Sequence, residues 1–146
     1  MVLKTKHSEI IFGDSCWGSL NSYVKTNAYS SVFLLTDTNT KLKCLPLANT
    51  KIEFDFNTLE MQAGEENKHI LSCVSLWNSL SEKGADRKSL LINIGGGVVT
   101  DLGGFVACTF KRGIDFINIP TSLLAMVDAS VGGKTGIDLG ALKNQV

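Results

Sequence analysis

The 146-residue sequence has no excess of either charge, because 14 lysines and arginines balance 14 aspartates and glutamates. This balance argues against a nucleic-acid-binding arm or a basic membrane patch. No apolar run approaches the roughly 20 residues that a membrane span needs, and the N-terminal residues lack the apolar stretch of a signal peptide. The four cysteines form no C-x-x-C pair. We therefore expect a cytoplasmic protein whose cysteines are free thiols that serve as small buried apolar side chains.

The sequence also has few candidate metal ligands. Its two histidines, His7 and His69, are far apart in the chain, whereas a zinc site needs about four converging ligands. No stretch rich in Pro, Gly and Ser divides the chain, so residues 1–146 are predicted to form one domain. We expect this domain to contribute no metal ligand of its own.

Apolar runs of strand length alternate with segments that have the periodicity of a helix. Expected strands lie at 2–4, 9–12, 31–35, 52–56, 90–94 and 116–119. One helix is expected to begin near Asp14 or Ser15, with Trp17, Leu20 and Val24 on one face, and another at 64–68, with the apolar stripe Ile70, Val74, Trp77 and Leu80. A third is expected to begin at Val98. A fourth, capped by Thr121, is expected to run through Leu123, Leu124 and Val127. The alternation predicts an α/β domain, Rossmann-like, with a largely parallel sheet and flanking helices.

The strongest local motif is the glycine-rich run 95–101, GGGVVTD, which follows a predicted buried strand and opens a predicted helix. Glycines permit a tight turn and close approach of a ligand to the backbone, and a helix N-terminus favours a pyrophosphate. Thr100 stands where the common dinucleotide fingerprint has its last glycine. An ordinary Rossmann dehydrogenase is therefore disfavoured, and a glycine turn that serves packing alone remains the alternative.

A second glycine-rich run, Gly132 to Thr135, superficially resembles a phosphate-binding P-loop. That motif requires a glycine five residues before Gly133, where this chain has Asp128, so the P-loop interpretation is rejected. Lys134 suits an anion because its ammonium is a compact point charge. The alternative is an ordinary solvated surface lysine.

Polar residues elsewhere allow two interpretations as well. Asp37 lies at the end of a predicted strand, where it accepts hydrogen bonds either from a ribose or within a turn. Charged and amide side chains of the later chain either surround an anionic, polyhydroxylated ligand or are unrelated surface groups; these are Glu65, Lys68, Lys111, Arg112, Asp128, Lys134, Lys143 and Asn144.

From Gly95 to Asn144 the sequence resembles the N-terminal half of the 3-dehydroquinate synthase family. The resemblance rests on the runs GGGVVTDLGGF (95–105), KRG (111–113), IPTSLLA (119–125), VDASVGGKT (127–135) and KN (143–144). The runs TDTN (36–39) and GEENK (64–68) match in order and approximate place. The resemblance implies the NAD-binding domain of a two-domain enzyme.

The resemblance also implies the chemistry. Such enzymes convert the phosphorylated sugar acid 3-deoxy-D-arabino-heptulosonate 7-phosphate into 3-dehydroquinate and phosphate. They do so by transient oxidation with NAD, phosphate elimination, re-reduction and closure of a carbocycle. A divalent metal, zinc or cobalt, would be bound by one Glu and two His of a helical C-terminal domain that this sequence does not contain. We therefore expect a truncated enzyme that is inactive alone, and a homodimer.

The family's residue roles transfer to matching positions. The resemblance assigns NAD contacts to Asp37, Thr38, Asn39, Glu65, Glu66, Asn67, Lys68, Gly96, Gly97, Val98, Asp101, Thr121, Ser122 and Lys143. It assigns substrate contacts to Arg112, Asp128, Lys134 and Asn144. The alternatives left open are another NAD- and metal-dependent sugar-phosphate cyclase, a related metal-dependent alcohol dehydrogenase, and a non-catalytic nucleotide-binding domain.

Overall fold

The computed structural model describes residues 1–4, 8–131 and 133–146. A parallel sheet with the strand order β4-β3-β5-β6 forms its centre. The strands are β3 (Val32–Asp37), β4 (Asn57–Met61), β5 (Leu90–Gly95) and β6 (Asp115–Pro120). The two inner strands, β3 and β5, are buried along almost their whole length. Their continuous apolar runs are typical of strands covered on both faces, as predicted.

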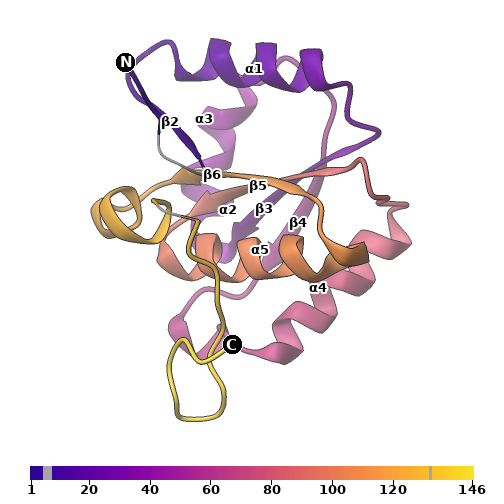
Figure 1. Ribbon diagram of the computed structural model, residues 1–146, viewed down its shortest axis with the longest axis vertical. Helices are drawn as coiled ribbons and strands as arrows, with labels where there is room; N and C mark the ends of the chain where they lie inside the picture. The colour runs from indigo at the N-terminus through magenta and orange to yellow at the C-terminus, as the bar shows by residue number, and fades with distance from the viewer. Residues whose placement is uncertain (5–7, 132) are drawn as a thin grey trace.

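Helices cover both faces of this sheet (Figure 1). One face packs on α4 (Ile70–Glu82) and α5 (Gly97–Thr109), and the other on α1 (Cys16–Asn27) and α3 (Leu45–Asn49). Successive strand residues serve opposite cores, so that Phe33 enters the α4–α5 side and Leu34 the α1–α3 side. The predicted Rossmann-like α/β architecture is confirmed. Among the described residues, no helix is long and apolar enough to cross a bilayer.

The strand predicted at 52–56 is wrong, because β4 begins only at Asn57, opposite Phe33 of β3. Ile52, Phe54 and Phe56 are instead partly buried against the core on the α1–α3 side. Their alternating pattern therefore belongs to a connecting segment that turns one face toward the core. Alternation alone does not distinguish such a segment from a strand.

The helix predicted from residue 64 is divided. A 3-10 turn, η1 (Glu65–Asn67), comes first, and α4 starts at Ile70, with the ring of His69 accepting a hydrogen bond from the Ser72 N–H (3.3 Å) as its N-cap. The predicted apolar stripe holds in part, because Leu80 is buried and Trp77 packs partly buried against the core. Ile70 and Val74 are exposed instead, and Cys73 and Leu76 take their place in the core. Burial raises the pKa of the Cys73 thiol to about 11.

The prediction for the cysteines is confirmed only in part. All four are free, as expected. Cys73 is buried, but Cys16 and Cys44 are half-buried and Cys108 is exposed. The expectation of small buried side chains therefore holds for Cys73 and is wrong for Cys108.

The chain ends carry the least enclosed elements. The strands predicted at 2–4 and 9–12 form β1 (Val2–Lys4) and β2 (Glu9–Ile11), which pair antiparallel, and residues 5–7 between them lie outside the described residues. After β6, the predicted helix forms as η3 (Ala125–Ala129), which has π-helical hydrogen bonding. Its predicted apolar residues Leu123, Leu124 and Val127 are exposed. The cap also differs from the prediction, since Ser122 Oγ, rather than Thr121, accepts from the Ala125 N–H (3.3 Å).

Candidate functional site

The glycine turn joins the buried end of β5 to the start of α5. Gly95 has no room for a side chain, since an added Cβ would lie 2.4 Å from Cβ of Val99. Gly96 is the N-cap of α5 and provides no side-chain cap. The first N–H groups of a helix have no partner within the helix, and they coincide with the positive end of its dipole. This end of α5 therefore offers backbone donors and positive potential to a phosphate.

The space in front of this turn is bordered by small side chains. A Cβ added at Gly96 would meet Ser122 Oγ at 3.5 Å, and one added at Gly97 would meet Cβ of Ala129 at 3.7 Å. The Thr121 N–H donates to the Gly95 carbonyl (2.9 Å), which extends the β5–β6 pairing past Pro120. The structure thus brings Thr121 and Ser122 beside the turn, and their contact with NAD stays a prediction.

Asp37 lies at the same edge of the sheet, because β3 and β5 are adjacent and parallel. Its Oδ1 accepts hydrogen bonds from the N–H groups of Asn39 (2.9 Å) and Thr40 (2.7 Å). These bonds form a capping box at the start of α2 (Thr38–Lys43). Asp37 therefore bonds to its own backbone neighbours, but as the cap of a helix and not within the turn that the sequence suggested. Contact of Asp37, Thr38 and Asn39 with NAD stays a prediction.

A buried lysine joins three segments next to α5. Lys68 is only 3% exposed, and its Nζ donates to Asp101 Oδ2 and to Asn144 Oδ1, both at 2.6 Å. The Lys68 carbonyl accepts from the Asp138 N–H (2.9 Å). The side chain of Lys68 therefore has protein partners, whereas the predicted role was a contact along the cofactor.

Asp101 is the acidic member of this group. Burial raises the pKa of Asp101 above its ordinary value of 3.8, and this effect outweighs the opposing effect of the Lys68 ammonium. The negative charges of Glu65 and Asp128 raise it further. Desolvation disfavours the charged carboxylate, and the Lys68 ammonium opposes that effect.

Two further ion pairs lie in the same part of the molecule. Lys134 Nζ donates to Asp128 Oδ1 (2.6 Å), and Lys143 Nζ lies 3.5 Å from Glu65 Oε1. The Asp128 carboxylate raises the pKa of Lys134, and the charge of Asp101 contributes to the same shift. The structure therefore gathers the predicted residues Glu65, Asp101, Asp128, Lys134, Lys143 and Asn144, with Lys68, near the first half of α5.

The remaining predicted residues of this region make local contacts and do not join the group of charged side chains. Val98 is half-buried in the first turn of α5. Asn67 Nδ2 donates to the Ala63 carbonyl (2.9 Å), which closes the loop of η1. Glu66 is exposed and folds back over Gly64. Gly132 of the second glycine-rich run lies outside the described residues.

Arg112 is separate from this group. It lies in η2 (Phe110–Arg112), beyond the C-terminal end of α5, whereas the glycine turn is at the N-terminal end. The 13 residues of α5 separate the two by about 20 Å at ~1.5 Å per residue. Within one chain, therefore, Arg112 is not brought to the other predicted substrate residues.

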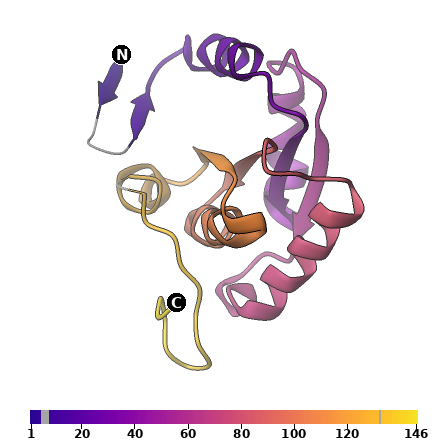
Figure 2. The same cartoon turned by 45° about the vertical axis from the view of Figure 1, so that its right-hand side comes forward.

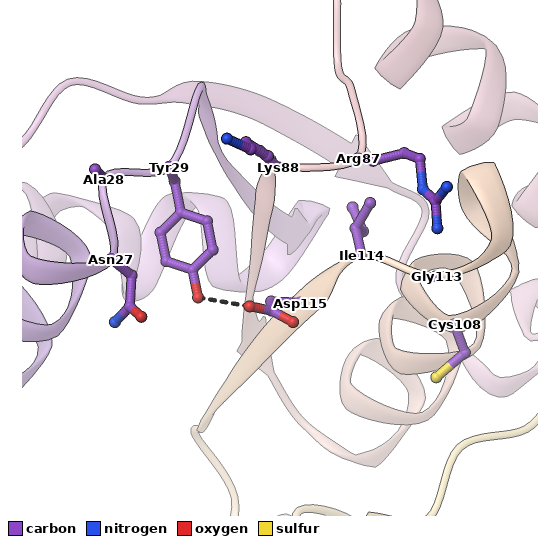
Figure 3. Close-up of a pocket in the computed structure, with 9 residues that line it drawn as sticks. All are labelled: Asn27, Ala28, Tyr29, Arg87, Lys88, Cys108, Gly113, Ile114 and Asp115. Atoms are coloured by element: carbon purple, nitrogen blue, oxygen red, sulfur yellow. Dashed lines mark hydrogen bonds between the residues drawn. The ribbon is translucent and has the colours of Figure 1, made fainter.

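An open hollow of about 620 Å³ lies near Arg112, at the edge of the sheet opposite the glycine turn. Figure 3 shows Tyr29 pointing across it to donate a hydrogen bond to Asp115 Oδ2 (2.8 Å), with Arg87 and Cys108 on the other side. None of the predicted site residues lines this hollow. The chemistry-bearing residues therefore identify the candidate site better than the size of the hollow does.

No metal site is evident in the described part of the chain. Among these residues, no three His, Cys, Asp or Glu side chains converge as metal ligands would. The donor set therefore does not fit a metal, and we assign no metal ligand to the described residues. The backbone donors at α5 do fit the pyrophosphate of a dinucleotide.

Sequence reasoning missed Asp138 and Thr135. Asp138 Oδ1 accepts a hydrogen bond from the Asn144 N–H (2.8 Å). The methyl group of Thr135 packs against Gly104 so closely that a Cβ added there would lie 2.5 Å from it. Both residues hold the last segment of the chain against α5 and Lys68. Asp138 is close to Asn144 in sequence, but its contact with Lys68 is a tertiary one that no local pattern indicates.

Comparisons with known proteins show which family the chain resembles. Residues 58–146 match the family described as 3-dehydroquinate synthase N-terminal. The chain is 52% identical over 128 residues to a 3-dehydroquinate synthase of Parabacteroides distasonis, covering 87% of this chain and 36% of that protein. It is 40% identical over 148 residues to that of Endomicrobium trichonymphae, covering 97% and 40% respectively.

A solved structure extends the likeness to the fold. A 2-deoxy-scyllo-inosose synthase complexed with carbaglucose-6-phosphate, NAD+ and Co2+ superposes with a TM-score of 0.84 and 25% identity, covering 94% of this chain and 39% of that one. The chain thus spans less than half the length of these relatives. The family match includes β4 from its second residue, the glycine turn and every gathered charged residue. The chain belongs to the 3-dehydroquinate synthase N-terminal family.

Proposed function

We propose that this chain is the NAD-binding part of a 3-dehydroquinate synthase. The full enzyme would convert 3-deoxy-D-arabino-heptulosonate 7-phosphate into 3-dehydroquinate and phosphate. The observation that carries the proposal is the uncapped N-terminus of α5, which lies beside the group of Lys68, Asp101 and Asn144. Because the chain spans only 36% to 40% of its relatives, turnover is assigned to a longer polypeptide. We expect the 146-residue chain alone to be inactive.

The residues divide into two roles. The first N–H groups of α5 bind the pyrophosphate, and Asp37 to Asn39 and Thr121 and Ser122 border the rest of the cofactor. NAD, when bound, supplies reversible oxidation of a substrate alcohol. Asp128 and Asn144 orient substrate hydroxyls, and the Lys134 ammonium binds the carboxylate or phosphate, because charge-assisted hydrogen bonds combine strength with direction.

Arg112 enters this scheme only through a second copy of the chain. It lies at the far end of α5 from the other substrate residues, so it contacts the same substrate only from a neighbouring subunit. A homodimer that places Arg112 of one subunit at the site of the other is therefore part of the proposal. Mixed dimers of an Arg112→Ala and a Lys134→Ala chain would test it, because they would regain one intact site.

A chimera tests the function. This chain is joined to the C-terminal part of the Parabacteroides distasonis relative, and phosphate release and 3-dehydroquinate formation are measured with NAD and a divalent metal. We expect turnover, and we expect Lys134→Ala or Asp128→Ala to reduce kcat/KM by ~10-fold or more. Lys25→Ala, in the last turn of α1, is the control and should leave turnover unchanged. A folded chimera that binds NAD but releases no phosphate contradicts the proposal.

A second candidate is another sugar-phosphate cyclase. The similarity to 2-deoxy-scyllo-inosose synthase over 94% of the chain supports it. The same chimera discriminates if the C-terminal part is also taken from such a cyclase. Turnover of a different sugar phosphate by both chimeras, without turnover of the heptulosonate by either, would favour this alternative.

A further inference from the structure

Lys68 differs from the other lysines near the site in its burial. Lys143 and Lys134 have side chains that are 69% and 67% exposed, and each pairs with one exposed carboxylate. Lys68 is 3% exposed and contacts two side chains at once. A lysine that only binds a ligand needs an open path to it. The enclosure of Lys68 therefore indicates a role that it performs through its protein partners.

The partners of Lys68 come from distant parts of the chain. Asp101 is 33 residues away on α5, and Asn144 is 76 residues away in the last segment. An ammonium has three N–H donors, and these two contacts use two of them. Lys68 thus connects the helix that begins at the glycine turn to the segment that carries Lys143 and Asn144.

The backbone around Lys68 holds the same segment. The Lys68 carbonyl accepts from the Asp138 N–H (2.9 Å), and His69 and Asp138 form an isolated parallel bridge. Asp138 in turn accepts from the Asn144 N–H (2.8 Å). Asn144 has a φ of 53°, in the left-handed region that asparagine tolerates better than most residues. The last segment is therefore fixed to Lys68 at two points, Asp138 and Asn144.

We propose that Lys68 is a positioning residue that couples the cofactor half of the site to the substrate half. Its ammonium joins Asp101 to Asn144, so a cofactor held at the first turns of α5, beside Asp101, also orders the segment of Lys143 and Asn144. We call the contacts of Lys68 with Asp101 and Asn144 the tie. The coupling between cofactor and substrate binding rests on the proposed function, whereas the tie itself does not. Since coupling free energies are reciprocal, the ordered segment also strengthens cofactor binding.

Amide hydrogen exchange at Asp138 tests the tie in this chain without any ligand. Asn144→Gly removes the amide acceptor and keeps the positive φ, so we expect the protection of the Asp138 N–H to fall by ~10-fold or more, because hydrogen bonds to charged groups are among the stronger ones. Asn144→Asp keeps an acceptor and should keep the protection. Equal protection in the wild type and Asn144→Gly overturns the tie.

Addition of NAD tests the coupling. We expect saturating NAD to raise the protection of Asp138 in the wild type and in Asn144→Asp, and to leave it unchanged in Asn144→Gly and Lys68→Met. Lys4→Met, which removes an exposed ion pair in the hairpin, is the control and should respond like the wild type. If Lys68→Met does not fold, Asn144→Gly still decides the result.

The outcomes separate the two proposals. A wild-type chain that binds NAD with no change at Asp138 overturns the coupling, and so does an equal rise in Asn144→Gly. A chain that binds no NAD overturns both the proposed function and the coupling, while the tie is judged by exchange without ligand.

Discussion

The two halves of the candidate site are held in place by different means. The cofactor half is built on β3, β5 and α5, where Leu102 has 0% exposure and the glycine turn closes on Val99. The substrate half follows β6, where Leu124 is 68% exposed and the chain then runs beside α5 to its C-terminal end mostly as a loop (Figure 2). Core packing thus positions the first half, and a few polar contacts position the second. The difference teaches that one fold can hold one half of a candidate site by core packing and the other half by contacts of single polar residues.

The largest expected effect compares leucines from the two halves. Leu102→Ala removes a fully buried side chain and should lower the free energy of unfolding by about 2–5 kcal/mol. Leu124→Ala, in the exposed segment after β6, should change it by less than about 0.5 kcal/mol. Urea unfolding monitored by circular dichroism measures both. Equal losses would show that the segment after β6 is packed as firmly as α5.

The next effect is the loss of the buried ion pair. Lys68→Met leaves Asp101 without its cation, and we expect a loss of about 3 kcal/mol near neutral pH. The pKa of Asp101 is higher in the folded state than its ordinary value, so folding favours the protonated carboxyl. The stability that comes from this protonation is present at low pH and is lost as pH rises through the raised pKa. The loss should therefore be smaller at about pH 4.5 than at about pH 7.5.

Denaturant unfolding at both pH values provides the measurement. Lys4→Met, with its exposed partner Glu9, is the control and should show no comparable dependence on pH. A loss for Lys68→Met that is the same at both pH values would contradict the assignment of Asp101 as the charged partner of Lys68.

A smaller effect concerns two glycines inside helices. An added Cβ at Gly103 would lie 2.1 Å from Oδ1 of the buried Asn93, whereas one at Gly18 of α1 would meet nothing within 4 Å. Gly103→Ala should therefore cost about 1–3 kcal/mol by overpacking, and Gly18→Ala should stabilise by up to about 1 kcal/mol through helix propensity. Thermal unfolding compares them, and stabilisation by both would refute the close contact of α5 with β5.

The smallest effect tests the edge of the cofactor half. Asp37→Ala removes the side chain that caps α2 and should cost about 1 kcal/mol. Ser15→Ala is a matched control, because Ser15 is the N-cap of α1 but makes no side-chain cap hydrogen bond. Its effect on unfolding should be close to zero. A cost for Ser15→Ala as large as that for Asp37→Ala would contradict the capping geometry.

Much of the cofactor half could be predicted from the sequence. β3 and β5 are continuous apolar runs, and the glycines before Val98 mark the start of α5, so local signals suffice there. The segment 52–56 misled because one-sided packing outside a sheet produces the same alternation. The α4 stripe was partly displaced because the side chains that meet the core, Cys73 among them, depend on how the helix docks.

The substrate half could be predicted only as a set of residues. Their identities follow from family resemblance, but their arrangement depends on tertiary contacts such as that of Lys68 with Asn144, 76 residues apart. No periodicity indicates such a pair. The separation of Arg112 from the group follows from the direction of α5, which becomes evident only when β5 and β6 are placed side by side.

The most direct test of the central claim is a titration of the isotope-labelled chain with NAD, followed by amide chemical shifts. The account predicts that the N–H signals of Gly97, Val98 and Val99, at the start of α5, shift most, with Asp37 and Ser122 next. Signals around the opposite hollow, such as those of Arg87 and Cys108, should remain unchanged. Shifts centred on that hollow, with the α5 amides unmoved, would contradict the claim that the glycine turn binds the cofactor.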